Sequence, residues 1–393
     1  MNILGELFEM RKLRMATPGP TQVPQEILLA GAQEMIHHRS RQMEDIINEI
    51  NRELPDLFLT KQDIYILLSS GTGAMEAAVS NSFNRGDKVL VVSNGYFGER
   101  FTDICTVFGL EVITVSSPWG TSVNIEEVER AYKQHPDIKG VLTVYSETST
   151  GAVNDVKAIG SLFRDTEVLV IVDAISGLIS HELSMDDWGL DIVLAASHKG
   201  FMMPPGLAFV AISPKAWKVI NEIQPSTYYF SFKRFKKFYP MAPSSPGVSL
   251  LLALKKSLDL LKAEGLSNAT RRHARIARAT QRGLEALGFH LFVQSPHVRS
   301  HTVTAALAPS GIDAALLLKK LNKEYGLTIT GGQGEFKGKM IRIGHIGAID
   351  EIDLFGIFGI MELVLTEMGY QVQSGISMTA LSDALGGGVI HHA

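Results

Sequence analysis

The stretch Asp191-Ile-Val-Leu-Ala-Ala-Ser-His-Lys199 is an apolar run that ends in a lysine, and the glycine- and proline-rich segment 200–206 follows it. A short apolar run bounded by turn signals predicts a buried β-strand. Burial disfavours the charged form of Lys199, which lowers its pKa and favours nucleophilic attack on carbonyl groups. Such lysines form Schiff bases, including with pyridoxal phosphate. An isolated lysine could instead reach for water, but Asp173 ends the preceding strand in the same way, which favours a shared site.

Strand and helix patterns alternate through the first half of the chain. The strands that we expect cover residues 64–69, 88–93, 111–115, 140–146, 168–173, 191–197 and 207–212. Near-continuously apolar strands that alternate with amphipathic segments are typical of a parallel sheet with helices on both faces. The last strand follows the one before it too closely for a helical crossover, so we expect it to be antiparallel. The sequence therefore predicts an α/β fold with a large, mainly parallel, seven-stranded sheet.

The length of 393 residues is enough for two domains. Residues 1–24 are expected to form an N-terminal arm, because Thr17-Pro-Gly-Pro-Thr21 does not favour a regular element. Residues 25–265 contain the alternating pattern and form the expected large domain. Residues 266–372 suggest a smaller C-terminal α+β domain. The glycine-containing tail, residues 373–393, is expected to be mobile or loosely packed.

The composition is that of a soluble globular enzyme, with 45% hydrophobic and 20% charged residues. The net charge of −4 gives no reason to expect nucleic acid or an anionic membrane as a partner. The basic run from Arg271 to Arg278 is more simply a solvated helix face. The only cysteine, Cys105, excludes an internal disulfide and suits a reducing cytoplasm. We see neither a signal peptide nor an apolar run of the ~18 residues that span a membrane, and we expect no bound metal.

The notable residues cluster at the carboxyl ends of the expected strands, where open parallel sheets bind ligands. The first strand runs into a glycine-rich turn that contains Gly71, Thr72 and Gly73 and opens a helix. Free N–H groups at such a helix start suit a phosphate, although the turn could equally serve tight packing. The turn does not match the G-x-G-x-x-G pattern of dinucleotide sites.

Four further positions could complete a site for a flat, charged ligand. Tyr96 or Phe97 could stack on a cofactor ring, or belong to the core. The hydroxyl of Thr148 could donate to a ring oxygen or cap a helix. Asp173 could keep a pyridinium nitrogen protonated, or cap the next helix. Arg342, within an apolar strand, could bind a substrate carboxylate or form an interdomain salt bridge.

Taken together and in this chain order, these segments resemble class V pyridoxal-phosphate aminotransferases of fold type I, in particular the alanine–glyoxylate, serine–glyoxylate and serine–pyruvate group. The resemblance covers roughly Thr17 to Tyr370. Its carriers are Pro18-Gly-Pro-Thr21, Ser70-Gly-Thr-Gly-Ala-Met-Glu76, Asn94-Gly-Tyr-Phe-Gly-Glu-Arg100, Glu147-Thr-Ser-Thr-Gly151, Val172-Asp-Ala-Ile-Ser176, Ser197-His-Lys-Gly200, Pro204-Pro-Gly206 and Arg342-Ile-Gly344.

The resemblance implies a role for each position in binding pyridoxal 5'-phosphate. By that resemblance Lys199 forms the internal aldimine and moves the proton between the substrate Cα and the cofactor, and Asp173 pairs with the pyridine nitrogen. Phe97 stands where the family has a tryptophan, and His198 stands where many relatives have a glutamine. The remaining cofactor-binding positions are the phosphate-binding Gly71, Thr72 and Gly73, and Thr148 near the ring oxygen.

The resemblance also implies a substrate side and a partner subunit. Arg342 would bind the substrate α-carboxylate, and Gly19, in the arm, would lie at the substrate entrance. In the family a tyrosine and a threonine from the neighbouring subunit complete the phosphate site. Ser245 best matches that threonine, and Tyr239 is a weaker match for the tyrosine. We therefore expect a homodimer with shared active sites, and the aromatic, proline-rich segment 228–246 is too apolar for an idle surface loop.

The expected function is transamination from serine or alanine to a 2-oxo acid, glyoxylate or pyruvate. One alternative is a cysteine desulfurase-like lyase, which needs a nucleophilic cysteine on a mobile loop. Cys105 lies instead within an amphipathic helical pattern, where an inert buried thiol is the simpler interpretation. A second alternative is a non-catalytic protein that binds a small molecule on the same sheet.

Overall fold

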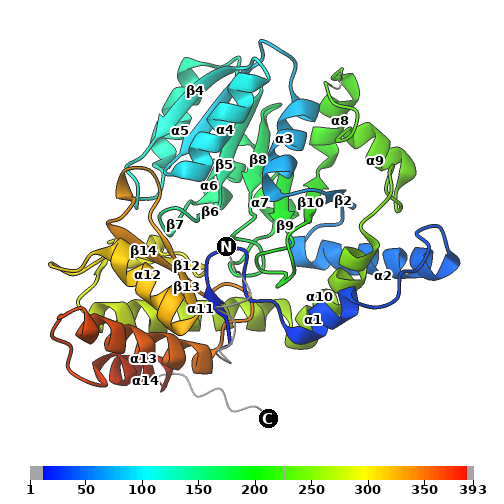
Figure 1. Ribbon diagram of the computed structural model, residues 1–393. Helices are drawn as coiled ribbons and strands as arrows, with labels where there is room; N and C mark the ends of the chain where they lie inside the picture. Colours follow the sequence, from blue (N-terminus) through cyan, green and yellow to red (C-terminus); the bar gives the residue numbers. More distant parts are fainter. Residues whose placement is uncertain (1–11, 225, 387–393) are drawn as a thin grey trace, which may run out of the picture.

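The computed structural model describes residues 12–224 and 226–386, and its centre is a seven-stranded sheet (Figure 1). The strand order is β2-β10-β9-β8-β5-β3-β4. The strands are β2 (Ile64–Leu68), β3 (Lys88–Ser93), β4 (Glu111–Ser116), β5 (Gly140–Val144), β8 (Leu169–Asp173), β9 (Ile192–Ala196) and β10 (Leu207–Ile212). Only β10 runs antiparallel to its neighbours β2 and β9 in this sheet. All seven predicted strands are confirmed, and so is the antiparallel direction of the last of them, β10.

Both faces of this sheet are covered by helices, which explains its near-continuously apolar strands. Along β8, Leu169 and Ile171 join the hydrophobic cluster of one face, and Val170 and Val172 join that of the other. The first cluster contains residues of α3 (Gly71–Ser82), α4 (Tyr96–Val107), α8 (Pro214–Glu222) and α9 (Phe232–Phe238). The second contains residues of α1 (Gln25–Gly31), α2 (Arg41–Phe58), α5 (Ile125–Gln134), α6 (Val156–Phe163), α7 (Met185–Trp188) and α10 (Val248–Glu264).

Local sequence signals set several helix starts. Ser40 precedes α2, and its hydroxyl accepts a hydrogen bond from the Met43 N–H at 3.2 Å. Asp350 and Asp353 form a capping box at the start of α13 (Glu351–Glu367), because each side chain accepts from the backbone N–H of the other residue. Pro55 lies inside α2 near its end, and Leu59 closes that helix in a left-handed conformation.

A second sheet of five strands has the order β1-β13-β14-β12-β11. Its strands are β1 (Arg14–Ala16), β11 (His290–Leu291), β12 (Val303–Leu307), β13 (Leu327–Gly331) and β14 (Met340–Gly344). Its hydrophobic cluster includes residues of α11 (Leu266–Ala286), α12 (Ala314–Tyr325), α13 and α14 (Ile376–Gly386). A two-stranded ribbon, β6 (Ser146–Glu147) and β7 (Ala152–Val153), and two 3₁₀ turns, Pro296–Val298 and Gly334–Phe336, complete the described elements. The mainly parallel large sheet and the smaller α+β unit confirm the predicted fold class.

Two segments differ from the expectations. Arg14–Ala16 was assigned to an arm without regular structure, but it forms β1 and pairs in parallel with β13. Three residues carry too little periodicity to reveal a strand whose partner lies near the other end of the chain. The tail was expected to be loose, yet α14 packs against α11 and α13 and buries Leu381 completely. The expectations for residues 1–11 and 387–393 lie outside the described residues.

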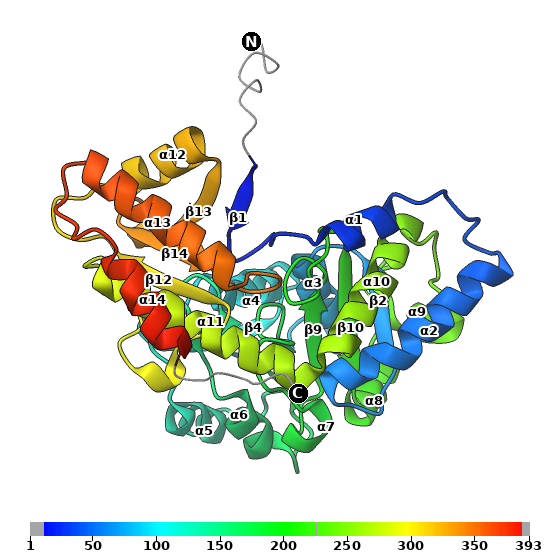
Figure 2. The same ribbon diagram turned by 90° about the horizontal axis from the view of Figure 1, so that it is seen from below.

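The two sheets are joined by successive helices. Figure 2 shows α10 and α11 running one after the other from the large sheet to the small one. Gly265 separates them at a φ of +81°, a backbone conformation that favours glycine. The division into a large domain, residues 25–265, and a small domain, residues 266–372, remains a prediction. None of the helices in the described parts of the chain is long and apolar enough to cross a membrane.

Candidate active site

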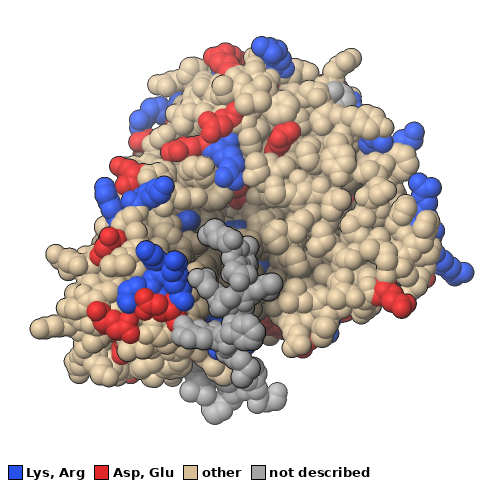
Figure 3. All heavy atoms as spheres, viewed as in Figure 1, with Lys and Arg blue, Asp and Glu red and all other residues tan. Residues whose placement is uncertain are grey.

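Most of the predicted site residues line one cavity of about 160 Å³ at the carboxyl ends of the large sheet's parallel strands. They are Gly19, Gly71, Thr72, Phe97, Thr148, Asp173, His198 and Lys199. They come from the segment after β1, the start of α3, the start of α4, the turn after β6, the end of β8 and the loop after β9. Figure 3 shows one face of the molecule, on which basic and acidic side chains are interspersed mainly over the left side of the view.

Lys199 is buried three residues beyond the end of β9, with 7% of its surface exposed. Burial lowers its pKa to about 8, an effect that the nearby Asp173 carboxylate partly opposes. Its Nζ donates a hydrogen bond to the backbone carbonyl of Pro18. The neighbouring Gly19 is packed so closely that an added Cβ would lie 2.5 Å from Lys199 Cε. A neutral amine is therefore accessible near neutral pH, and the glycine leaves room for it.

Asp173 is the last residue of β8 and is 3% exposed. Burial raises the pKa of its carboxyl group to about 7, while a hydrogen bond from the Ile175 N–H to Oδ1, 2.8 Å long, opposes that rise. Lys199 and Arg100 also favour the charged form, and Glu147 disfavours it. Such a carboxylate can stabilise a positive charge placed in the cavity.

The glycine-rich turn forms the start of α3. An added Cβ at Gly71 would lie 2.5 Å from Ile175 Cδ1, and one at Gly73 would lie 1.9 Å from Ser69 Oγ. A side chain at Gly71 would displace the end of Ile175, and one at Gly73 would displace the Ser69 hydroxyl, so glycine suits the close packing here. Ser70 precedes the helix, and its hydroxyl accepts from the Gly73 N–H at 3.4 Å. Gly73 does not line the cavity, whereas Ser70, Gly71 and Thr72 do, beside the N–H groups of a helix start that suit an anion.

The aromatic at the start of α4 that faces the cavity is Phe97. Its neighbour Tyr96 is 39% exposed and packs edge-on against the Phe97 ring. Arg100, one helical turn later, lies with its guanidinium carbon 4.6 Å from the centroid of Phe97. Its Nη1 donates to Thr72 Oγ1 at 2.9 Å, so it joins α4 to the start of α3. The sequence analysis gave Arg100 no role, although its position three residues after Phe97 placed it on the same helix face.

Arg342 lies in β14 of the small sheet and is 6% exposed. Its Nε donates to the Gly331 carbonyl at 2.8 Å, and its Nη1 donates to the Thr148 carbonyl at 2.8 Å. Burial lowers its pKa to about 10, and the negative charge of Glu147 opposes this. Among the residues that the structure describes, Arg342 donates to backbone carbonyls rather than to the carboxylate of a salt bridge. The residue itself does not line the cavity, but its partner Thr148 does.

The family model for class V aminotransferases ("Aminotransferase class-V") matches residues 16–342, most of this chain. The chain belongs to the class V aminotransferases. An uncharacterized aminotransferase of Methanocaldococcus jannaschii is 38% identical, over 94% of this chain and 97% of that protein. The L-aspartate–glyoxylate aminotransferase of Paracoccus denitrificans is 34% identical, over 93% of this chain and 94% of its own.

Other relatives and a solved structure agree with this membership. Relatives at 31–34% identity are named serine–glyoxylate or alanine–glyoxylate aminotransferase, and two at 36% are named as subunits of soluble hydrogenases. The ureidoglycine–glyoxylate aminotransferase of Bacillus subtilis superposes with a TM-score of 0.91 at 27% identity, covering 95% of this chain and 98% of its own. The fold is that of pyridoxal-phosphate-dependent aminotransferases, and this class V aminotransferase is an enzyme.

The residues present fit the cofactor that the family implies. His198 lines the cavity, and its buried Nδ1 has no hydrogen-bond partner among the described residues. Burial lowers the pKa of His198 to about 4, so its ring is neutral. The cavity therefore combines an unpaired polar atom, a helix start, a buried lysine and a buried aspartate, which match a flat ring with a phosphate group.

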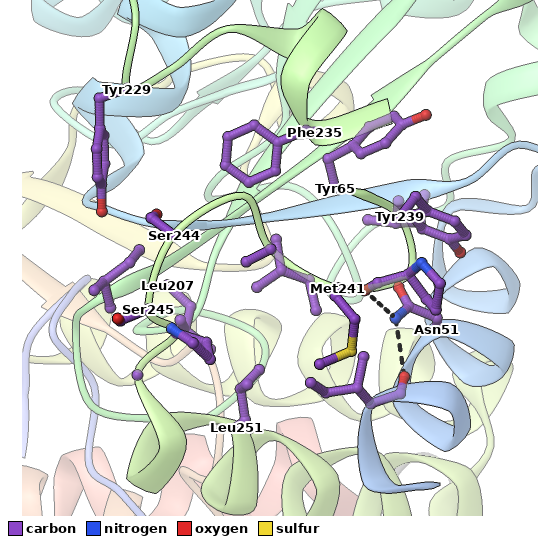
Figure 4. Close-up of a pocket in the computed structure, with 18 residues that line it drawn as sticks. Asn51, Tyr65, Leu207, Tyr229, Phe235, Tyr239, Met241, Ser244, Ser245 and Leu251 are labelled. Carbon is purple, nitrogen blue, oxygen red and sulfur yellow. Dashed lines mark hydrogen bonds between the residues drawn. The ribbon is translucent and has the colours of Figure 1, made fainter. Parts of the chain in front are cut away.

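Ser245 and Tyr239 lie elsewhere within the aminotransferase chain. They line a separate, largely apolar pocket beside β2, where Figure 4 shows Ser245 next to Leu207 and Tyr239 next to Asn51. Its cavity volume of about 40 Å³ holds a few water molecules and no organic cofactor. The expected contact of Ser245 and Tyr239 with the cofactor of a second subunit stays a prediction.

Proposed function

We propose that this protein transfers the amino group of serine or alanine to glyoxylate or pyruvate, with pyridoxal 5'-phosphate held at Lys199. The observation that carries the proposal is the meeting of Lys199 and Asp173 in one cavity beside the start of α3. The names of the glyoxylate aminotransferases among its relatives support the acceptor. We also propose that the enzyme acts in the cytoplasm.

Three parts of the chain would hold the cofactor. The N–H groups at Ser70, Gly71 and Thr72 would receive the phosphate. Phe97 would stack on the ring, with less area than the tryptophan of the family. Asp173 would hold the proton on the ring nitrogen, and the positive ring would in turn favour the ionised carboxylate. When bound, the cofactor supplies an electron sink for the negative charge that develops at the substrate Cα.

Lys199 would carry the proton at the reacting atom. A pKa of about 8 leaves part of the amine neutral at neutral pH, so it can accept a proton from the substrate Cα and return it. The Pro18 carbonyl accepts a hydrogen bond from the same nitrogen and can hold the amine in place when it is not bonded elsewhere. Lys199 would thus serve first as an anchor and then as an acid and base.

Arg342 would orient the substrate through its α-carboxylate. A guanidinium has five N–H donors, and the recorded bonds to Gly331 and Thr148 use two of them. The remaining donors can bind a carboxylate in the paired geometry that lysine cannot offer. Amino acid donors and 2-oxo acid acceptors both carry this carboxylate, so one group would serve both half-reactions.

We further propose a homodimer in which Ser245 of one subunit reaches the cofactor phosphate of the other. Three aromatic side chains near Ser245 in the sequence are exposed in the single chain. They are Tyr228 at 74%, Tyr229 at 45% and Phe238 at 45%. Apolar surface of this kind favours burial against another copy. Mixing a Lys199→Ala chain with a Ser245→Ala chain should produce heterodimers with one intact composite site, and activity above that of either parent. A fully active monomer at low concentration would contradict shared sites.

The proposed function is tested by adding pyridoxal phosphate to the purified protein and recording its visible absorption. We expect a new band that borohydride removes, with the reduced cofactor mapped to Lys199 by peptide mass. A panel of donors and acceptors, followed by single half-reactions, then ranks serine, alanine and other donors. Absence of the band, or its persistence in Lys199→Ala, would falsify the role of this lysine.

A cysteine desulfurase-like function is less well supported. Cys105 is fully buried in α4, and burial raises the pKa of its thiol to about 12. A thiol in this state is neither exposed nor ionised, as a sulfur-accepting nucleophile must be.

A further inference from the structure

A fully buried glutamate lies immediately behind the cavity without lining it. Glu147 ends β6, and both of its carboxylate oxygens are occupied. Oε2 accepts from the backbone N–H groups of Phe97 and Gly98, each at 3.1 Å. Oε1 accepts from the N–H of Ser149 at 3.0 Å and from its hydroxyl at 2.5 Å. We propose that Glu147 is a positioning residue that aligns the cofactor-stacking Phe97 with the substrate-binding Arg342; this rests on the function proposed above.

On one side, Glu147 supplies the missing cap of α4. Gly95 precedes this helix and has no side chain to bond the first N–H groups. The carboxylate of Glu147 takes two of these N–H groups, and Ser149 Oγ accepts from the N–H of Tyr96 at 3.1 Å. Phe97 is therefore held by residues of the turn after β6, about 50 positions later in the chain, rather than by a local cap.

Close packing explains why a glycine, Gly95, precedes α4. An added Cβ at Gly95 would lie 2.4 Å from Glu147 Cγ and 2.6 Å from Ser149 Oγ. Any side chain there would push the carboxylate away from the helix. The absence of a local cap and the presence of the distant carboxylate thus depend on each other.

On the other side, the residue after Glu147 contacts both Arg342 and Ser176, of which Ser176 lines the cavity. The Thr148 carbonyl accepts from Arg342 Nη1 at 2.8 Å, and the Thr148 hydroxyl lies 2.5 Å from Ser176 Oγ. The negative charge of Glu147 also favours the charged forms of Arg342 and Lys199. The turn 147–149 therefore sets the distance between the ring-stacking helix and the small-sheet arginine.

A carboxylate is needed because all four of its partners are donors. Burial raises the pKa of Glu147, and the hydrogen bonds from Ser149, Gly98 and Phe97 lower it, so the donors favour the ionised form. A glutamine has one accepting oxygen and one donating nitrogen. In either orientation, Glu147→Gln would place its NH₂ group against two N–H groups of α4 or against the donors of Ser149.

The test uses the full-length protein stripped of cofactor and titrated with pyridoxal phosphate. We expect Glu147→Gln to weaken cofactor binding about tenfold, the factor that corresponds to loss of one well-placed helix cap. The visible circular dichroism of the bound cofactor should also change, because Phe97 stacks at a different angle. The exposed Glu126→Gln, in the first turn of α5, is the matched control and should change neither quantity.

A double-mutant cycle separates positioning from simple destabilisation. If Glu147 acts through Phe97, Phe97→Leu and Glu147→Gln combined should weaken cofactor binding no more than Phe97→Leu alone. Additive losses would overturn the proposal. So would a lower melting temperature of Glu147→Gln with unchanged cofactor affinity and dichroism.

Gly95→Ala provides a second route if Glu147→Gln does not fold. It displaces the carboxylate sterically without changing its chemistry, and should reproduce the weaker binding and altered dichroism. An unchanged cofactor affinity in a folded Gly95→Ala protein would count against the proposal. If the wild-type protein itself does not bind pyridoxal phosphate, the proposed function fails. If the wild-type protein binds it and the Glu147 and Gly95 variants bind it equally well, only the present inference fails.

Discussion

The large sheet places titratable groups in the cavity, whereas the small sheet places a guanidinium next to a residue that lines it. Lys199 and Asp173, at strand ends of the large sheet, have pKa values moved by burial to about 8 and about 7. Arg342, inside a strand of the small sheet, keeps a pKa of about 10 and is held by backbone carbonyls. Groups that titrate near neutrality can exchange protons, whereas a permanently charged guanidinium can only bind. We therefore expect the large sheet to supply the groups that transfer protons and the small sheet to supply the group that recognises the substrate.

The largest effect should follow removal of the lysine. Lys199→Ala should reduce transamination by about 10⁴-fold or more, because the amine is both anchor and proton carrier. Stopped-flow absorbance of each half-reaction measures the loss, and an unchanged melting temperature would show that the fold survives. The exposed Lys218→Ala, on α8, is the control. Near-normal turnover of Lys199→Ala would show that transamination does not depend on this residue of the large sheet.

Asp173→Asn should lower kcat by about 10²- to 10³-fold while the donor KM changes little. An amide cannot stabilise the positive charge on the ring nitrogen, so the deficit appears in the transition state. Steady-state kinetics with one donor and one acceptor give both parameters, and Asp165→Asn at an exposed position serves as the control. Equal rates for Asp173→Asn and wild type would leave Asp173 as a structural residue that binds the Ile175 N–H.

Arg342→Lys should affect recognition rather than chemistry. Lysine keeps the charge but loses the paired donors, so KM for donor and acceptor should each rise about 10- to 100-fold with a smaller change in kcat. The exposed Arg282→Lys, on α11, should behave like wild type. A fall in kcat alone would show that the division of labour between the two sheets is wrong.

A smaller effect concerns pH and a group of buried histidines. Burial lowers the pKa of His273 and of His345 to about 3 each, and lowers those of His181 and His301 as well. His345 Nδ1 donates to the His301 carbonyl at 3.0 Å, and in the neutral ring Nε2 then accepts from the Thr304 hydroxyl at 2.9 Å. The rings of His181 and His301 stack with their centroids 4.2 Å apart. These rings connect the loop after β8 to the small sheet in their neutral form.

Because the folded pKa values are depressed, the unfolded chain binds protons first as pH falls below about 6.5. Stability is therefore complete above that pH and is lost progressively toward pH 3. Each fully buried histidine should lower the free energy of unfolding by about 1 kcal/mol between pH 6.5 and 5.5. Urea titrations at several pH values measure this slope, and His345→Gln should flatten it. A pH-independent stability over this interval would contradict the neutral, buried state.

The part of the site on the large sheet was predictable because its residues follow apolar runs. A buried strand that ends in Asp173 or leads to Lys199 stands out in the sequence, and the parallel arrangement brings such ends together. The glycine-rich turn at Gly71 and the aromatic pair Tyr96 and Phe97 also follow apolar runs, but the sequence left open which of the two aromatics faces the cavity. Ser245 stays a prediction, since its expected contact involves a second subunit.

Some roles were not predicted from the sequence, because they depend on contacts between elements that are distant along the chain. Glu147 was visible only as part of a motif, because its function as a cap for α4 requires the packing of that helix against the turn after β6. Arg100 shows its role only once Thr72 is placed beside it. The packing of α14 against α11 and α13, which buries Leu381 of α14, was hidden by the nearby glycines, which suggest a loose chain.

The strand β1 has a consequence for the order in which the protein is completed. Arg14 pairs with Leu327, roughly 300 residues further along, and the backbone of Thr17 and Pro18 lies directly against Gly344. During synthesis, Arg14–Ala16 therefore cannot pair until residues 327–329 have been made. Contacts of such long sequence separation form late, since the closed loop costs entropy before it gains any contact. The Pro18 carbonyl that accepts a hydrogen bond from Lys199 lies just after β1, so a chain that ends before β13 would lack the strand with which the segment before this carbonyl pairs.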